Sequence, residues 1–332
     1  MGARHGQKIK LFHIVDILRD CTDDYHPLSA TEICDKLAAL GITAERKAIY
    51  NDIECLVDYG FDIVKTRTPK SGYFMGARDF ELPEIYLLSD AVRTAKFISV
   101  KKTRELTLKL DRMLSSYQRS GREKGIYINS NGKTKNEEIF YNIDTISNAI
   151  NNGHKITLKY GIRTLNENRE MTVNYKERKI SPYAMTWQDD HYYLIGNYDK
   201  YDNLMHLRID RMRSVNETDE AVRSMGEVSP YKDVFDVADY TAKLFSMYGG
   251  EMVDVELRCN RKILEQVADR FGENIFIKNL TDTEFSFNVS AAVSEALVTW
   301  IMNYGENIEV VKPENLREMV KSRAKEILKK YK

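Results

Sequence analysis

The sequence predicts an α+β protein made of four consecutive segments, and three observations indicate it. Residues 1–80 show three short helical patterns followed by two short strands, and residues 136–225 show one helix followed by short strands. Residues 226–332 alternate strands with helices. Residues 81–135 join the first two regions and are predicted to be a helical linker.

The composition fits a globular chain that has no overall electrostatic attraction to nucleic acid or to anionic membranes. The chain has 332 residues, enough for two or three domains of roughly 100–200 residues each. It holds 50 Lys and Arg against 50 Asp and Glu, so any surface that binds anions must be local. No run approaches the roughly 20 apolar residues of a membrane span, and residues 1–10 lack the apolar core of a signal peptide. We therefore expect no membrane partner.

Cysteine spacing and motif content argue against metal sites and enzymes. The four cysteines form no CxxC pair, and no Cys/His set has zinc-finger spacing. The phosphate loop, the dinucleotide fingerprint, HExxH and GxSxG are all absent. Asp189, Asp190 and His191 lie between two predicted strands, where a turn is expected. We expect a reduced, cytoplasmic protein with no metal, no cofactor and no catalytic residues.

Residues 1–80 begin with three helical patterns. The first has apolar residues at positions i, i+3, i+4 and i+7, namely Leu11, Ile14, Val15 and Leu18. Ser29 and Glu32 have the spacing of a capping box at the start of the second helix, and Gly41 ends that helix. The third helix is expected to begin after Thr43 and to end at Gly60.

A hairpin is predicted directly after these helices. Residues 63–64 and 73–75 read as its strands, with a turn at residues 69–72. The link between the second and third helices is only residues 41–43, which is the tight turn of a helix-turn-helix. Three helices followed by a hairpin therefore indicate a winged helix-turn-helix.

One face of the third helix has the residue types that read DNA. If Ile49 and Ile53 face the core, Lys47 and Asn51 point away from it, with Tyr50 and Arg46 at the flanks. Arg or Lys reads guanine and Asn reads adenine in the major groove. The hairpin adds candidates for phosphate contacts, namely Lys65, Arg67 and Lys70.

The alternative is a solvated helix face on a winged helix that binds protein. The charge of residues 1–80, with 11 basic and 12 acidic side chains, favours that alternative. Most of the acidic side chains lie on other elements, however, so we expect double-stranded operator DNA as the partner.

The basic excess lies in residues 81–135, with 12 basic and 6 acidic side chains. Residues 84–118 have a helical pattern, and residues 119–136 lose it and gain Gly, Asn, Ser and Lys, as in a linker or flexible loop. In residues 136–225, a helix near residues 139–150 precedes strands at residues 156–160, 192–195 and 205–209. Short strands with polar turns suggest a small barrel or a curled sheet.

The C-terminal segment, residues 226–332, has a recognisable order of elements. Strands are predicted at residues 252–257, 274–277, 284–289 and 308–311, and helices at residues 261–271, 294–304 and 313–330. The first six elements follow the order of a ferredoxin-like fold.

The residues between positions 180 and 212 gather aromatic side chains, histidines and two arginines on neighbouring strands. Arginine forks beside stacked aromatic rings suit phosphates and bases. Here the chain resembles the WYL-domain transcriptional regulators. Tyr192-Tyr193-Leu194 corresponds to the Trp-Tyr-Leu tripeptide that names the family, with Tyr in place of Trp, and the strand Leu207-Arg208-Ile209-Asp210-Arg211-Met212 follows. The helix from Arg46 to Ile53 and the wing end Gly72-Tyr73-Phe74 are similar to the family's usual DNA-binding domain.

The resemblance implies a winged helix-turn-helix, an Sm-like β-barrel WYL domain and a C-terminal WCX-like extension. It also implies a homodimer whose WYL domain senses a ligand, in known cases a nucleotide or a nucleic acid. The family's pocket residues correspond to Tyr193, Arg208 and Arg211, with Ser181, Tyr183 and His206 as further candidates.

Strand geometry sets a condition on this pocket. Because side chains alternate faces, His206 and Arg208 share one face and Arg211 falls on the other. Both arginines reach one ligand only if the strand ends or bulges near Asp210. Otherwise one arginine is structural and pairs with Asp210.

Together these observations predict a ligand-responsive transcriptional regulator that binds operator DNA. One rival is an accessory protein that binds nucleic acid and assists an effector nuclease without a promoter role. Salt-dependent but sequence-independent binding would favour that rival. A second rival is an enzyme with an attached winged helix, against which the missing catalytic motifs argue.

Overall fold

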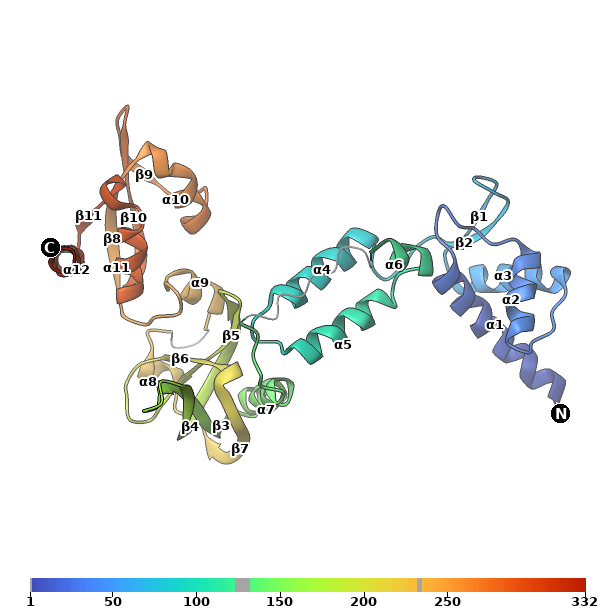
Figure 1. The fold of residues 1–332 in the computed structure, drawn as a ribbon, viewed down its shortest axis with the longest axis horizontal. Helices are drawn as coiled ribbons and strands as arrows, with labels where there is room; N and C mark the ends of the chain where they lie inside the picture. Colours follow the sequence, from blue (N-terminus) through green and yellow to red (C-terminus); the bar gives the residue numbers. More distant parts are fainter. Residues whose placement is uncertain (1, 123–131, 232–234) are drawn as a thin grey trace. The chain divides into compact units, whose positions relative to one another are not determined.

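The computed structural model describes residues 2–122, 132–231 and 235–332. The chain mixes helices and strands, as expected, and divides into two compact units, residues 1–137 and 138–332 (Figure 1). Each unit is built around its own buried apolar side chains. Among the described residues, none of the helices combines the length and the apolar character that crossing a membrane requires.

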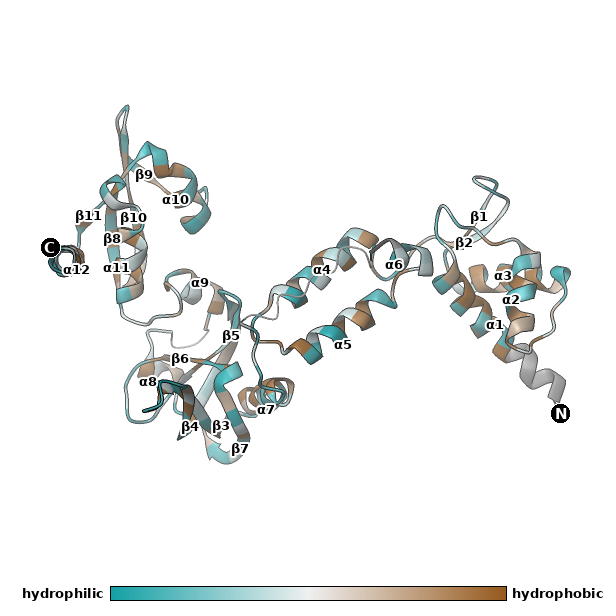
Figure 2. Cartoon of the chain, viewed as in Figure 1, coloured by the Kyte–Doolittle hydropathy of each residue, from teal (hydrophilic) through white to brown (hydrophobic). Residues whose placement is uncertain are grey.

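The first unit begins with three helices and a hairpin, in the expected order. Their bounds are α1 Gly2–Cys21, α2 Ala30–Ala39, α3 Arg46–Tyr59, β1 Ile63–Thr66 and β2 Gly72–Met75. The apolar side chains of α1 and α3 belong to a common core, which includes Ile14, Leu18, Ile49 and Ile53. In Figure 2, brown hydrophobic positions alternate with teal hydrophilic ones along these helices. The hairpin strands pair antiparallel, with Val64 opposite Phe74. The capping box at α2 is present, because Ser29 and Glu32 exchange hydrogen bonds.

The link between α2 and α3 is longer than expected. It covers residues 40–45, with Leu40 as the C-cap of α2 and Glu45 as the N-cap of α3. Gly41 has φ +78°, which an L side chain rarely adopts, so the helix ends where the glycine predicts. Ala44 and Glu45 also lie in this link, so α3 begins at Arg46 and the prediction that it begins directly after Thr43 is wrong.

The described residues of the first unit include three further helices. They are α4 Leu82–Thr94, α5 Val100–Asp111 and α6 Ser116–Arg122, and α4 and α5 lie side by side (Figure 1). Ser99 caps α5 by accepting a hydrogen bond from the Lys102 amide. The helical order of α6 corrects the expectation of a loop from residue 119. The rest of that expected loop falls partly on residues 123–131, which lie outside the described residues.

The second unit begins with helix α7 Ile139–Asn152 and a five-stranded antiparallel sheet. The strands are β3 His154–Leu165, β4 Met171–Gln188, β5 His191–Asn197, β6 Met205–Arg208 and β7 Met212–Ala221, in the order β6-β5-β4-β3-β7. The first part of β4 pairs with β3, and the part from Ser181 onward pairs with β5. Strands β4 and β7 were not among the strands predicted from the sequence.

The predicted barrel is not closed. Within the described residues, β6 and β7 are the two edges of the sheet and do not pair with each other. The physical reason is local: β6 has four residues, and the chain turns into the 3₁₀ helix η2 Ile209–Arg211 before β7 pairs with β3. Of the two architectures that the sequence suggested, the open curled sheet is the better description.

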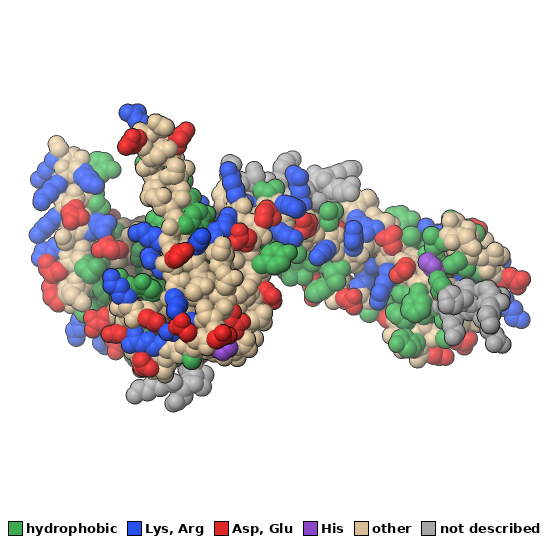
Figure 3. Space-filling model, turned by 90° about the horizontal axis from the view of Figure 1, so that it is seen from below, with side chains coloured by type: hydrophobic (Ala, Val, Ile, Leu, Met, Phe, Trp, Pro, Cys, Tyr) green, Lys and Arg blue, Asp and Glu red, His purple; other side chains and the backbone are tan. Residues whose placement is uncertain are grey.

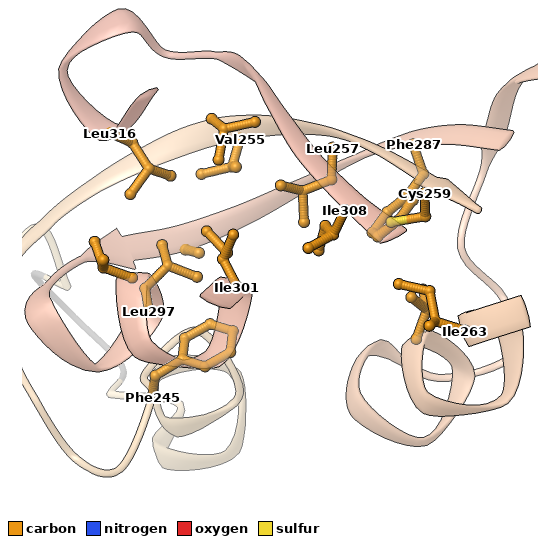
Figure 4. Close-up of a cluster of buried hydrophobic side chains, with 14 of the residues drawn as sticks. Phe245, Val255, Leu257, Cys259, Ile263, Phe287, Leu297, Ile301, Ile308 and Leu316 are labelled. Atoms are coloured by element: carbon orange, nitrogen blue, oxygen red, sulfur yellow. The ribbon is translucent and has the colours of Figure 1, made fainter. Parts of the chain in front are cut away.

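The C-terminal part has a four-stranded sheet in the order β11-β8-β10-β9. After the short helices α8 Met225–Val228 and α9 Val237–Ala242, the elements are β8 Glu251–Asn260, η3 Arg261–Ile263, α10 Leu264–Phe271, β9 Ile277–Leu280, β10 Glu284–Val293, α11 Glu295–Met302, η4 Gly305–Asn307, β11 Ile308–Lys312 and α12 Glu314–Lys330. Each predicted strand and helix is present, although β9 lies three residues later than expected. Figure 4 shows the core of this part, where Leu297 and Ile301 lie beside Phe245.

Candidate functional site

Helix α3 exposes the residues predicted to read DNA. Ile49 is fully buried and Ile53 is 4% exposed, whereas Arg46, Lys47 and Asn51 are exposed. Tyr50 is 41% exposed, and its hydroxyl lies 3.5 Å from the Arg46 guanidinium. The helix therefore turns its apolar side inward and leaves a polar face toward solvent, which is basic at Arg46 and Lys47 and carries the exposed Glu54 nearer its C-terminal end.

The three hairpin candidates are exposed but differ in their partners. Lys65 lies over the Tyr73 ring, with its Nζ 5.8 Å from the ring centroid. Lys70 donates to Glu32 at 2.6 Å, and this bond is the largest cause holding the pKa of Glu32 down at about 2. Arg67 forms no ion pair with the described residues. Lys70 is therefore already engaged with the α2 capping box, which its sequence position did not indicate.

The surface outside these elements carries both signs of charge. On the face drawn in Figure 3, basic and acidic side chains are interspersed. This mixture agrees with the balance of 50 basic and 50 acidic residues. A role in binding nucleic acid must therefore depend on local geometry and not on net charge.

A cavity of about 760 Å³ lies in the second unit, against β5 and β6. Four of the sequence-predicted residues line it, namely Tyr193, His206, Arg208 and Arg211. Tyr193 and Arg208 are direct partners across the β5–β6 pairing. The rest of its lining comes from Tyr160 on β3, Asp189 and His191 at the β4–β5 turn, residues 203–205, and residues 246–250.

The end of β6 brings both arginines to this cavity. β6 stops at Arg208, and η2 turns the chain so that Arg211 also reaches the cavity. Arg208 donates to Asp210 through Nε at 3.0 Å and through a terminal nitrogen at 2.7 Å. Both alternatives raised by the strand geometry therefore hold together: the strand ends near Asp210, and Arg208 is paired with it.

Arg211 is the cavity cation that has no partner among the described residues. Its guanidinium forms no hydrogen bond or ion pair with the described residues, and its Nε is buried without a hydrogen-bond acceptor. A buried donor that lacks an acceptor costs roughly 1–3 kcal/mol. An anionic ligand in the cavity would supply the missing acceptor.

Burial favours the neutral forms of His206 and Tyr193 in this cavity. Burial lowers the pKa of His206 to about 4, and its Nε2 lies 3.0 Å from the Tyr240 hydroxyl. Burial also raises the pKa of the Tyr193 phenol. The Tyr160 hydroxyl accepts from the Arg208 amide at 3.3 Å. The cavity thus offers aromatic faces and neutral hydrogen-bonding groups beside two guanidinium cations, with Asp189 as the carboxylate of its lining.

Two sequence-predicted residues lie elsewhere. Ser181 is fully buried, and its hydroxyl accepts from the Arg223 amide at 3.0 Å. The Tyr183 hydroxyl donates to the Arg223 carbonyl at 2.8 Å. Neither lines the cavity. Both hydroxyl groups hold β4 against the chain that follows β7, so Ser181 and Tyr183 have a structural role.

The sequence reasoning missed several residues that line the cavity. Tyr160 could have been found, because it alternates with lysines on a predicted strand that neighbours the cluster. His191 and Asp189 were assigned to a turn, and the structure confirms that turn: Asp189 and Asp190 have φ +48° and +61°. For residues 246–250, the sequence feature that could have pointed to the cavity is the glycine pair Gly249-Gly250. Among the described residues, the structure holds no group of His, Cys, Asp and Glu arranged to bind a metal ion.

Comparison with known proteins identifies two domains. Residues 141–217 match the WYL domain, and residues 251–328 match the WCX domain. No curated protein matches the chain. A solved structure of proteasome accessory factor B/C (PafBC) of Arthrobacter aurescens is 17% identical over 95% of this chain, with a TM-score of 0.26. The chain spans 47% of that solved chain.

Proposed function

We propose that this chain, which contains a WYL domain and a WCX domain, is a transcriptional regulator controlled by an anionic ligand. The Arg211 guanidinium in the WYL-domain cavity has no partner among the described residues, and this observation supports ligand sensing most directly. The exposed face of α3, with Arg46, Lys47, Tyr50 and Asn51, supports binding of double-stranded operator DNA. No catalytic role is proposed for any residue.

The proposal includes a more specific description of the domains. The order α1-α2-α3-β1-β2 supports a winged helix-turn-helix, with α3 in the major groove and the hairpin beside the phosphates. Helix α7 and its five strands support an open, Sm-like WYL domain. The order of the C-terminal elements and the β11-β8-β10-β9 sheet support a ferredoxin-like WCX domain.

The chemistry of the cavity favours a nucleotide or an oligonucleotide. A phosphate fits the two arginines, because guanidinium groups bind phosphate oxygens through paired hydrogen bonds. A base fits the aromatic side chains, since stacking on Tyr and His accepts any base. The volume of about 760 Å³ lies within the roughly 300–1,000 Å³ of typical ligand pockets. The side chains proposed to contact the ligand are Tyr193, His206, Arg208 and Arg211.

We further propose that two copies act together. A homodimer would place two α3 helices on operator half-sites, and ligand binding would change the spacing that the pair can span. Because the two sites are then coupled, the ligand and the operator alter each other's affinity by the same factor. The factor by which the ligand changes operator affinity must therefore equal the factor by which the operator changes ligand affinity.

The test is a binding experiment with the full chain and a labelled single-stranded DNA of about 12 nucleotides, within the site sizes of single-strand-binding folds. Polarisation would report its affinity for wild type and for Arg211→Gln. The affinity of wild type for its upstream promoter duplex would then be measured with and without the oligonucleotide, and with a panel of nucleotides. We expect oligonucleotide binding that depends on Arg211 and a changed duplex affinity.

Two results would contradict this proposal. If no oligonucleotide or nucleotide changes duplex affinity, the sensing part fails. If the chain binds promoter and scrambled duplexes equally, with a steep dependence on salt, the accessory-protein function becomes the better description.

A further inference from the structure

The short segment between the WYL and WCX domains has one side chain in each of two cores. We call residues 245–250 the connector segment. Phe245 is 5% exposed and belongs to the C-terminal core, where it lies beside Leu297 and Ile301 (Figure 4). Met247, two residues later, is also 5% exposed but packs in a different cluster, with Ile195 of β5. A displacement of this segment must therefore disturb both cores.

The connector segment also separates two cavities. Residues 246–250 line the ligand cavity of about 760 Å³. Ser246 and Tyr248 line a second cavity as well, of about 360 Å³, whose remaining wall includes Glu295, Thr299 and Trp300 of α11. Tyr248 is 58% exposed. A ligand that presses on the connector segment from one side thus has unfilled space on the other.

The backbone of this segment is held in an unusual form. Ser246 and Met247 have φ +48° and +58°, a left-handed conformation that L side chains adopt at a cost. A Cβ on Gly250 would lie 2.0 Å from the Val293 carbonyl oxygen, so β10 admits only glycine there. A Cβ on Gly249 would meet nothing closer than His206 at 3.6 Å, so Gly249 is open to the ligand cavity.

The WCX domain fixes the start of this segment through one arginine. Arg270 of α10 donates to the Leu244 carbonyl at 2.5 Å, and its guanidinium carbon lies 4.1 Å from the centroid of the Phe245 ring. The Ala292 amide of β10 donates to the Lys243 carbonyl at 2.9 Å. Phe245 in turn contacts Trp300, with 5.4 Å between the ring centroids.

We propose that the connector segment is the wall of the ligand site that determines specificity and that transmits occupancy to the WCX domain. Tyr248 and Gly249 contact the ligand, and Arg270 is a positioning residue that holds the segment in place. This inference rests on the proposed ligand function of the WYL domain. It adds that the WCX domain, none of whose residues line the cavity, holds one wall of the site in place through Arg270 and responds when the site is filled.

The two tryptophans of the chain allow a direct test. Trp187 lies on β4, and Trp300 lies against Phe245. In a Trp187→Phe chain, Trp300 is the remaining tryptophan and reports the environment of the connector segment. The probe is the labelled oligonucleotide of about 12 nucleotides used above. Its binding is followed by polarisation, and an unlabelled copy is used to follow tryptophan emission.

We expect the emission of Trp300 to change in proportion to oligonucleotide binding. Arg270→Gln should reduce the emission change by more than half while the chain still binds, because it removes the bond to Leu244. Arg270→Lys should restore part of it, and Arg261→Gln, an exposed arginine of the same domain, is the matched control. Gly249→Val should weaken the affinity by about tenfold, because it fills space that the ligand needs.

The outcomes separate this inference from the function on which it rests. Binding without any change in Trp300 emission would overturn the transmission by the connector segment and leave ligand sensing intact. Unchanged affinity in Gly249→Val would overturn the role of this wall in the site. Absence of binding to Trp187→Phe and wild type alike would instead count against the proposed function.

Discussion

Arg208 and Asp210 are joined by two hydrogen bonds, of 3.0 and 2.7 Å, across the point where β6 becomes η2. The Asp210 side chain is 6% exposed and the Arg208 side chain is 17% exposed, so the pair is largely removed from water. This pair fixes the orientation of Arg208, and the same turn delivers Arg211 to the cavity without a partner. The two arginines of the proposed ligand site thus have different surroundings, one paired with a carboxylate and one without a partner among the described residues.

Asp210→Asn tests the structural half of this arrangement. Removing the carboxylate charge leaves a half-buried guanidinium without its partner, so we expect the free energy of unfolding to fall by roughly 1–3 kcal/mol. Urea denaturation of the full chain measures this. Asp219→Asn, at an exposed position of β7, is the control and should change stability little. Equal stability of the two variants would show that the pair does not hold the turn.

Arg211→Gln tests the proposed ligand-binding half of this arrangement. Because Arg211 forms no hydrogen bond or ion pair with the described residues, its loss should not lower the free energy of unfolding, and removing the buried Nε donor should raise it by up to roughly 1–3 kcal/mol. Affinity for the labelled oligonucleotide should fall by about tenfold or more, since a charge-assisted hydrogen bond is lost. Arg213→Gln on β7 serves as the control. A large loss of stability in Arg211→Gln would assign this arginine a structural role instead.

The buried His206 predicts a dependence of stability on pH. Burial lowers its pKa to about 4 in the folded chain, from the ordinary 6.5. Between these values the unfolded chain binds more protons, so the stabilisation is complete above pH 6.5 and is lost as the pH falls toward 4. The loss should be on the order of 3 kcal/mol at most. Urea titrations at about pH 7 and about pH 4.5 measure this loss of unfolding free energy, which should be smaller in His206→Gln than in wild type.

Ser29→Ala tests the cap that positions α2 against α3. The Ser29 hydroxyl accepts from the Glu32 amide, so its removal should cost about 1 kcal/mol of unfolding free energy. Ser29→Asp keeps an acceptor at the N-cap and should retain most of the stability. Thermal melts of the three chains provide the comparison. Similar melting of Ser29→Ala and wild type would mean that α2 does not depend on its cap.

The order of elements was predictable because local signals agreed with the fold. Gly41 and Gly60 end their helices with left-handed φ, and Ser29 begins α2, so each boundary had a local chemical cause. The strand β4 was missed because its 18 residues mix polar and apolar side chains without clean alternation. It changes partners near Ser181, so no single face is buried along its length.

The candidate site was predictable only where its residues are adjacent in the chain. Tyr193 and Arg208 came from one cluster of the sequence, and their pairing follows from the register of β5 and β6. Ser181 and Tyr183 belong to the same cluster but bond to Arg223, a contact that depends on where the chain runs after β7. The Lys70–Glu32 pair and the connector segment also arise from tertiary packing, which strand periodicity does not encode.

The most direct measurement is binding of the full chain to its upstream promoter duplex at about 150 mM salt, with a scrambled duplex of equal length as the control. We expect a specific complex that the Lys47→Ala, Asn51→Ala double variant loses, because both exposed side chains on α3 would contact bases. Lys70→Ala should lower the affinity much less, since its ammonium group is paired with Glu32. Equal affinity for both duplexes, unchanged in the double variant, would contradict the proposal that this chain is a sequence-specific regulator.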